Sequence, residues 1–276
     1  MPAAQLHPAT VAELRRLVRP LTAAQVVSSA EELERIASAD PWRVQVSARG
    51  DVAVLGRWRD HLPYLAIEAL WCPASRSADA LGQIRRIAAE QAMTDVISPP
   101  TPAEDTTPYV EAGMHVETLV ATYRLVHGAP AGHPAPRPDC AIRTAGPSDL
   151  HALLEVDARC FGPFWRYDRN HLDRFVVLGR LALAEVEGEA VGYTLCTLHG
   201  DEGLLGRLCV VPDRRRQGIG AALVRDAVAH VWASGGRSIT LSTQTDNAPS
   251  QALYRREGFR DTGRRYAFLR FGQGEE

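Results

Sequence analysis

The stretch Leu208-Cys-Val-Val-Pro-Asp-Arg-Arg-Arg-Gln-Gly-Ile-Gly220 decides how this chain is interpreted. Its apolar start predicts a buried strand over Leu204–Val211, and the apolar stripe that begins at Ile219 predicts a helix. Gly218 and Gly220 lie at the turn between them. The first N–H groups of a helix have no intrahelical acceptor and lie at the positive end of the helix dipole. The turn is therefore predicted to bind an anion such as a pyrophosphate.

Two familiar phosphate-binding motifs do not fit this turn. The segment lacks the GxxxxGK[ST] pattern of a P-loop, and Leu223 occupies the position of the third glycine of a dinucleotide-binding fingerprint. A glycine-rich turn under a closely packed helix is the alternative interpretation of Gly218 and Gly220.

The sequence on both sides of the turn predicts an α/β domain. The predicted elements are a strand at 141–145, helices at 147–160 and 168–178, strands at 181–186, 190–197 and 204–211, a helix from 219 to 234, a strand at 238–243, a helix at 249–257 and a strand pair within 259–271. A mixed order of this kind is typical of a sheet with helices on both faces.

A segment rich in proline, glycine and alanine divides the chain. Residues 127–139 (HGAPAGHPAPRPD) lack apolar periodicity and are predicted to form a linker. The parts on either side, 1–126 and 140–276, are each long enough to bury a core. Tyr109-Val-Glu-Ala-Gly113 parallels Tyr254-Arg-Arg-Glu-Gly258 at an offset of about 140 residues, so the two parts are predicted to share one fold.

Composition and charge exclude several classes of protein. The 276 residues are 45% hydrophobic and 23% charged, as in ordinary globular proteins. A net charge of -2 argues against broad binding to nucleic acid or to an anionic membrane. The five cysteines have no paired CxxC spacing, so neither a disulfide framework nor a metal site is expected. Without an apolar run of membrane-spanning length, a cytoplasmic protein is expected.

Two separated motifs resemble the GNAT superfamily of N-acetyltransferases. Arg215-Arg-Gln-Gly-Ile-Gly220 is similar to that family's (R/Q)xxGx(G/A), and the strand Leu208–Pro212 before it is similar to LxVxP. Asn247-Ala-Pro-Ser-Gln-Ala-Leu-Tyr-Arg-Arg-Glu-Gly-Phe259 resembles NxxAxxLYxxxGF. The resemblance covers about 140–271 and reaches 1–126 only as a decayed copy. It implies two tandem GNAT-like domains, each a mixed, mostly antiparallel sheet flanked by helices.

The resemblance also implies acetyl-CoA as co-substrate, without a metal. Backbone groups of Val210 and Val211 would pair with the pantetheine amides, and the amides of residues 216–221 would hold the pyrophosphate. Asn247 would bind near the pantetheine arm, although capping the helix that follows it is an equal alternative. The donor-site residues implied in this way are Leu208, Val210, Val211, Arg215, Arg216, Gln217, Gly218, Ile219, Gly220, Ala221 and Asn247.

The resemblance assigns a proton donor but no proton acceptor. Tyr254 would protonate the departing CoA thiolate, with packing of its helix as the alternative role. Related ribosomal-protein acetyltransferases place a Glu five residues before the Asn, where this chain has Ser242. Asp201 and Glu202 are candidate bases, with solvated turn carboxylates as the alternative.

The remaining expectations concern the acceptor and the first half. The aromatic segment Phe161–Asp168 joins two predicted helices where the family builds part of its acceptor site, and it could equally plug the core edge. Aligning Pro73 with Pro212 places Asp79 at the position of Gly218, so the first half is not expected to bind pyrophosphate. This tandem arrangement with a decayed copy also resembles that of mycothiol synthases.

The sequence therefore predicts an enzyme that moves an acetyl group from acetyl-CoA to a primary amine of a small molecule or of a protein. A non-catalytic acyl-CoA-binding module is the alternative function.

Overall fold

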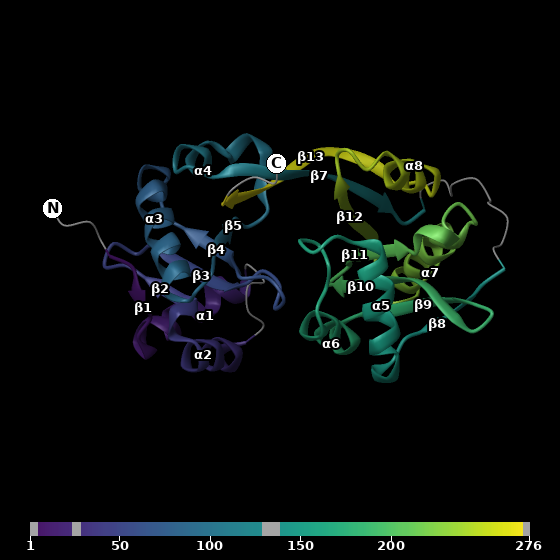
Figure 1. The fold of residues 1–276 in the computed structure, drawn as a ribbon, viewed down its shortest axis with the longest axis horizontal. Helices are drawn as coiled ribbons and strands as arrows, with labels where there is room; N and C mark the ends of the chain where they lie inside the picture. The colour runs from purple at the N-terminus through teal and green to yellow at the C-terminus, as the bar shows by residue number, and fades with distance from the viewer. Residues whose placement is uncertain (1–4, 24–28, 129–138, 273–276) are drawn as a thin grey trace. The chain divides into compact units, whose positions relative to one another are not determined.

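The computed structural model describes residues 5–23, 29–128 and 139–272 (Figure 1). The chain forms two compact units, which are Met1–Leu119 with Tyr266–Glu276, and Val120–Arg265. These units differ from the predicted halves, because residues 120–126 belong to the second unit and the end of the chain belongs to the first. Most of the predicted linker at 127–139 lies outside the described residues.

The first unit contains a sheet in the order β1-β2-β3-β4-β5-β13. Its elements are β1 (His7–Pro8), α1 (Val11–Ala23), α2 (Ala30–Ala39), β2 (Val44–Val46), β3 (Val52–Arg57), β4 (Tyr64–Trp71), α3 (Ala74–Glu90), β5 (Asp95–Ile97), β6 (Thr101–Pro102) and α4 (Thr107–Glu111). Leu81 and Ile84 of α3 are fully buried in one core with Leu65 and Ile67 of β4. The last residues of the chain complete this sheet, because Phe271 pairs with Val96 of β5.

The second unit contains a sheet in the order β7-β12-β11-β10-β9-β8. Its elements are β7 (His115–Val126, which begins in the first unit), β8 (Ala141–Thr144), α5 (Leu150–Cys160), α6 (Arg169–Leu178), β9 (Arg180–Val186), β10 (Glu189–His199), β11 (Glu202–Val210), α7 (Ile219–Ala233), β12 (Ser238–Gln244), α8 (Ala248–Arg256) and β13 (Arg260–Phe271, which ends in the first unit). All of these strand pairs are antiparallel except β11 with β12.

The predicted strand pair within 259–271 is wrong, because these residues form the single strand β13. Gly263 adopts a φ of +78°, and its N–H donates to Oδ1 of Asp261 at 2.9 Å. The chain does not reverse at this turn, and β13 continues through it. The strand beside β12 is instead the end of β7, where Val126 pairs with Ser238 and Val120 with Gln244.

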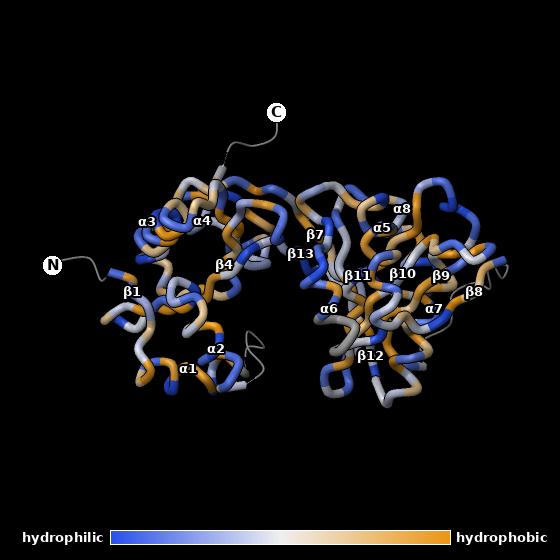
Figure 2. Tube along the Cα trace, turned by 60° about the horizontal axis from the view of Figure 1, so that its bottom comes forward, coloured by the Kyte–Doolittle hydropathy of each residue, from blue (hydrophilic) through white to orange (hydrophobic). Residues whose placement is uncertain are grey.

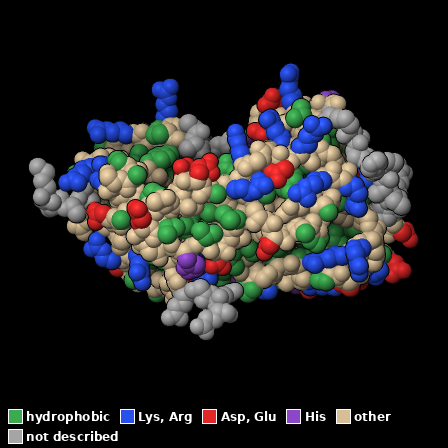
Figure 3. Space-filling model, turned by 90° about the horizontal axis from the view of Figure 1, so that it is seen from above, with side chains coloured by type: hydrophobic (Ala, Val, Ile, Leu, Met, Phe, Trp, Pro, Cys, Tyr) green, Lys and Arg blue, Asp and Glu red, His purple; other side chains and the backbone are tan. Residues whose placement is uncertain are grey.

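Apolar residues of alternating and helical period form the core of the second unit (Figure 2). Ile219, Leu223 and Val231 of α7 are buried against the sheet, and Leu153 and Val156 of α5 are buried as well. Basic and acidic side chains are interspersed on the face in Figure 3, in keeping with the small net charge of -2. No helix among the described residues is long and apolar enough to cross a membrane.

The two units repeat one backbone pattern, which confirms the predicted common fold. The parallel pairing of β11 with β12 ends at Leu205 and Leu241, and that of β4 with β5 ends at Ala66 and Ile97. The strands separate beyond these points. The short helices α4 and α8 also end alike. The N–H of Met114 donates to the carbonyl of Tyr109 at 3.0 Å, as that of Phe259 does to Tyr254 at 2.9 Å.

Candidate functional site

A free edge of β11 forms one wall of the candidate donor site. Leu195 of β10 pairs with Arg207, whereas Cys196 pairs with Leu205, so Gly206 is the extra residue of a bulge. Beyond Leu205, β11 has no partner on the β12 side in the described part of the chain. Backbone groups of such an edge can pair with an extended ligand as an added strand.

The register decides which backbone groups face this opening. The N–H of Val211 donates to the carbonyl of Val191 at 2.9 Å, so odd-numbered residues of this stretch direct their backbone groups toward β10. Leu208 and Val210 therefore direct theirs toward the opening. The carbonyl of Val210 accepts a hydrogen bond from Nε of Arg215 at 3.0 Å, and its N–H points away from β10.

Val211 does not fit its predicted role. Its N–H is bonded to Val191, and its carbonyl accepts a hydrogen bond from the N–H of Arg214 at 3.0 Å. Its side chain is fully buried. With both backbone groups engaged inside the fold, Val211 cannot pair with a pantetheine amide, and we leave it out of the donor site.

The turn between β11 and α7 presents a row of backbone amides. Arg216 and Gly218 adopt left-handed conformations, with φ of +63° and +85°. The first helical hydrogen bond in this region runs from the N–H of Ala222 to the carbonyl of Gly218 at 3.0 Å. Among the described residues, none of the amides of residues 216–221 donates to a backbone carbonyl. These N–H groups at the start of a 15-residue helix can bind a pyrophosphate.

Gly220 leaves room for only a small side chain. An added Cβ would meet Cδ2 of Leu253 at 3.4 Å and Cγ2 of Val210 at 3.8 Å, both ordinary van der Waals distances. An alanine therefore fits, and a longer side chain would enter the space beside the amide row. The side chain of Gln217 lies next to this turn, with Nε2 3.5 Å from the carbonyl of Asp213.

Asn247 caps α8, as one of its two predicted roles requires. Its Oδ1 accepts a hydrogen bond from the N–H of Ser250 at 3.2 Å. The cap fixes the start of α8 and thereby the position of Tyr254, which lies on the helix. The side-chain amide N–H groups of Asn247 are not used by this cap.

Tyr254 is buried between aromatic neighbours. Its side chain is 5% exposed, and its ring centroid lies 6.0 Å from that of Phe259 and 6.3 Å from that of Tyr123. Burial raises the pKa of Tyr254 well above its ordinary value, and the nearby Cys209 thiol raises it further. The hydroxyl therefore stays protonated at neutral pH, as a proton donor must.

A buried ion pair that sequence reasoning missed joins α5 to β11. Asp157 of α5 is fully buried and accepts hydrogen bonds from the guanidinium of Arg207 of β11 and from the hydroxyl of Tyr193 of β10. Burial raises the pKa of Tyr193 well above its ordinary value, so this hydroxyl remains a donor. The only sequence signal was a carboxylate on the apolar face of the predicted helix at 147–160.

The aromatic segment 161–168 packs over this ion pair. The Arg207 guanidinium lies 3.5 Å from the ring centroid of Phe161 and 3.9 Å from that of Tyr167. Nη2 of Arg207 donates to the carbonyl of Trp165 at 2.7 Å, and the N–H of Tyr167 donates to Asp157 at 2.7 Å. Arg207 lies just beyond the residues of β11 that pair with β12, so the segment lies at the mouth of the strand opening.

A histidine and a carboxylate form a pair at the start of α6. Nδ1 of His171 lies 2.9 Å from both carboxylate oxygens of Asp168, and its ring stacks on that of Tyr167 with centroids 5.5 Å apart. The side chain of His171 is 28% exposed. Asp168 therefore engages Nδ1 and fixes the orientation of the ring. In the sequence, this pair could have been recognised from the spacing of three residues between Asp168 and His171.

The two predicted candidate bases lie at the other end of β11. Asp201 and Glu202 are exposed, and Glu202 pairs in register with Ser238, where the strands are still joined. Glu202 accepts a hydrogen bond from Thr240 at 3.4 Å and lies 3.8 Å from Arg124. Glu202 therefore interacts with side chains on the surface of the sheet.

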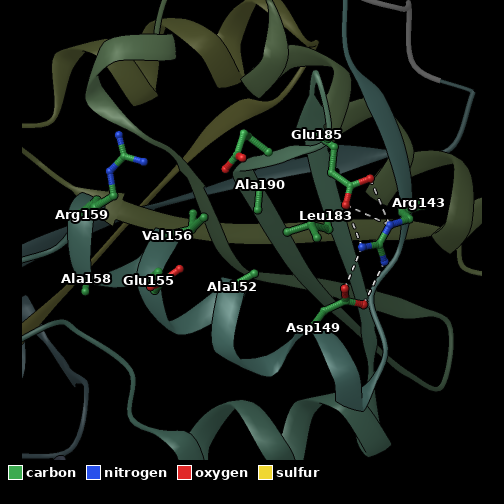
Figure 4. A pocket seen from close by; sticks show the side chains of 12 residues that line it. Arg143, Asp149, Ala152, Glu155, Val156, Ala158, Arg159, Leu183, Glu185 and Ala190 are labelled. Atoms are coloured by element: carbon green, nitrogen blue, oxygen red, sulfur yellow. Dashed lines mark hydrogen bonds and ion pairs between the residues drawn. The ribbon is translucent and has the colours of Figure 1, made fainter.

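A cavity of about 590 Å³ lies elsewhere in the second unit, between α5 and the β9–β10 hairpin (Figure 4). Arg143 bridges Asp149 and Glu185 there, with N–O distances of 2.7 Å to each. Arg143 holds the pKa of Asp149 at about 2. None of the predicted site residues lines this cavity, so it is separate from the donor site.

The equivalent turn of the first unit lacks the amide row. Helix α3 begins at Ala74, directly after Pro73, and no loop separates strand from helix. Asp79, predicted to replace the glycine, lies inside this helix and accepts a hydrogen bond from Nε2 of Gln83 at 3.3 Å. The first unit thus keeps the strand opening without an anion-binding turn.

Comparison with known proteins identifies the family. Residues 149–259 match the acetyltransferase (GNAT) family. This part of the chain, which contains the strand edge, the amide row and Tyr254, therefore belongs to the GNAT family of acetyltransferase enzymes. The resemblance inferred from the two motifs is confirmed.

Curated relatives include acetyltransferases of two kinds. The chain is 35% identical to a mycothiol acetyltransferase of Clavibacter michiganensis over 29% of its own length and 26% of the relative. It is 25% identical to a putative ribosomal-protein-alanine N-acetyltransferase of Bacillus subtilis over 45% of its length and 82% of that relative. The chain thus spans about a quarter of the first of these relatives.

Solved structures share the fold of nearly the whole chain. A GCN5-related N-acetyltransferase from Sphaerobacter thermophilus superposes with a TM-score of 0.64 at 21% identity, covering 96% of this chain and 94% of that one. A tandem GNAT protein from the clavulanic acid biosynthesis pathway gives a TM-score of 0.59 at 18% identity, covering 84% and 83%. The predicted fold class, two tandem GNAT-like domains, is confirmed.

Proposed function

We propose that this protein is an N-acetyltransferase that moves an acetyl group from acetyl-CoA to a primary amine. The observation that carries the proposal is the row of amides at residues 216–221, which donate to no backbone carbonyl in the described part of the chain, beside the free edge of β11. The free strand edge can pair with an extended chain, and the amide row can bind a pyrophosphate attached to it. A metal is not part of the proposal.

The donor site consists mainly of backbone groups. The backbone of Leu208 pairs with the pantetheine arm, the N–H of Val210 meets the thioester carbonyl at the end of that arm, and the amides of residues 216–221 hold the pyrophosphate. Asn247 uses its amide N–H groups toward the arm while its oxygen caps α8. The remaining donor-site residues are Arg215, Arg216, Gln217, Gly218, Ile219, Gly220 and Ala221.

Tyr254 is the proposed general acid. The N–H of Val210 stabilises the carbonyl oxygen as negative charge develops on it during attack by the amine. The Tyr254 hydroxyl, kept protonated by burial, then gives its proton to the sulfur that leaves. Because a thiol with a pKa of about 8.5 is already a good leaving group, the expected contribution is modest.

His171 is the proposed acceptor of the amine proton. Asp168 fixes its Nδ1, and the ring stacks on Tyr167 beside the mouth of the opening. Nε2 can take a proton directly or through a water molecule. Asp201 and Glu202 lie where β11 and β12 are still paired, which disfavours them.

The acceptor is a primary amine of a small molecule or of a protein. The relatives named above include acetyltransferases of mycothiol and of ribosomal-protein alanine, so their names favour neither kind. The test is thiol release from acetyl-CoA with a panel of amino acids, amino sugars, cysteinyl compounds and peptides. Binding of acetyl-CoA, seen as thermal stabilisation, without release in any of these reactions would support the alternative, a non-catalytic acyl-CoA-binding module.

A further inference from the structure

Arg166 carries an N–H group that the fold does not satisfy. This arginine lies in segment 161–168, and its own backbone N–H donates to the carbonyl of Gly162 at 3.0 Å. Its Nε is buried and has no hydrogen-bond partner among the described residues. A buried donor without an acceptor is unfavourable, so Nε of Arg166 requires an acceptor such as a water molecule or an anion.

The nearby carboxylates are already engaged by other groups. Asp157 accepts hydrogen bonds from Arg207, from Tyr193 and from the N–H of Tyr167. Asp168 is held by the ring and the backbone N–H of His171, both at 2.9 Å. Among the described residues, no ion pair joins Arg166 to either of these two carboxylates.

The position of Arg166 is fixed at the mouth of the opening. Its neighbour Trp165 accepts a hydrogen bond through its carbonyl from Arg207 at 2.7 Å, and its other neighbour Tyr167 donates one to Asp157 at 2.7 Å. Both partners belong to a buried ion pair. The backbone around Arg166 is thus anchored to β11, immediately beyond the residues that pair with β12.

We propose that Arg166 binds an anionic group of the acceptor, so that the substrates are primary amines that carry a carboxylate or a phosphate. This inference rests on the proposed acetyltransferase function. Planar guanidinium N–H groups match both kinds of anion, and the aromatic side chains of the segment provide an apolar border. The anion would supply the acceptor that Nε lacks.

The experiment compares pairs of amines that differ in one anionic group. The pairs are glycylglycine with glycylglycinamide, and phosphoethanolamine with ethanolamine, each assayed by thiol release from acetyl-CoA. We expect the wild type to favour the anionic member of at least one pair by tenfold or more in kcat/KM. The first pair reports on a carboxylate and the second on a phosphate.

Variants distinguish binding of the anion by the Arg166 guanidinium from an effect of the overall positive charge of the segment. Arg166→Gln should remove the preference, with a loss of roughly 10- to 100-fold for the anionic member and less than about 2-fold for the neutral one. Arg166→Lys should keep part of it. Arg169→Gln, at an exposed arginine of α6, is the matched control and should keep the preference.

Two results would overturn the inference. One is a wild type that uses both members of each pair equally well. The other is an Arg166→Gln variant whose activity falls equally for anionic and neutral amines while acetyl-CoA still stabilises it, because Arg166 would then support only the fold of the segment. Absence of thiol release with every amine would instead overturn the acetyltransferase function, and the inference with it.

Discussion

Nη2 of Arg207 lies 2.7 Å from Oδ1 of Asp157, and the two side chains are 7% and 0% exposed. The pair joins α5 to β11 at the point where β11 leaves β12, and the rings of Phe161 and Tyr167 cover it. Removing one partner of a buried ion pair leaves a charge without compensation, which is more unfavourable than the pair itself is favourable.

Asp157→Asn should therefore destabilise the protein. We expect the free energy of unfolding to fall by about 3 kcal/mol, measured by urea denaturation followed by tryptophan fluorescence. Asp149→Asn is the control, because the arginine partner of Asp149 is 44% exposed and the loss should stay below about 1 kcal/mol. Equal losses in the two variants would contradict the distinction between buried and exposed pairs.

Gly220→Asp should abolish stabilisation by acetyl-CoA, whereas Gly220→Ala should keep it. A Cβ fits at this position, but a carboxylate would lie in the amide row and repel the pyrophosphate. At about 100 times the dissociation constant, acetyl-CoA should stabilise the alanine variant by about 2.7 kcal/mol, measured as a rise in Tm. An aspartate variant that responds like the wild type would show that the cofactor binds elsewhere.

Titration calorimetry should give one CoA site per chain. Among the described residues, the second unit alone combines a strand opening with an amide row, since α3 of the first unit starts directly after Pro73. The site should disappear in Gly220→Asp. Two equivalent sites per chain, or binding that survives this substitution, would mean that the first unit also binds the cofactor.

Tyr254→Phe should lower turnover and leave binding of acetyl-CoA nearly unchanged. The substitution keeps the ring between Tyr123 and Phe259 and removes only the hydroxyl. We expect kcat to fall roughly 100-fold, the low end for general acid catalysis, because the thiolate leaves readily. Steady-state kinetics and thermal shifts measure the two effects. Weakened binding or a lower Tm with full turnover would make Tyr254 a packing residue.

His171→Gln should lower kcat by roughly 100-fold at saturating amine, because glutamine can still bind Asp168 but cannot take up a proton at neutral pH. His151→Gln is the matched control, since the side chain of His151 is 82% exposed and lies 3.3 Å from Glu155 on α5. Steady-state turnover of both variants checks this assignment. Full turnover in His171→Gln would show that another group takes up the amine proton.

The sequence alone determined the parts of this protein that are local in the chain. The strand edge, the turn and the start of α7 are consecutive, so apolar period and glycine placement predict them without knowledge of the remaining fold. The spacing from Tyr254 to Gly258 is likewise local, because one helix and its left-handed end contain both residues, with φ of +91° at the glycine.

Tertiary structure decided everything that depends on which distant segments meet. Asp157 and Arg207 are 50 residues apart, and neither belongs to a motif. Strand register, which no single-sequence pattern fixes, engaged the backbone of Val211 with Val191 and turned that of Val210 toward the opening. The sequence also did not predict which strands pair with each other, because any strand of suitable length and apolarity can add to the edge of a sheet. For this reason the sequence did not show that β7, from the other side of the linker, pairs with β12.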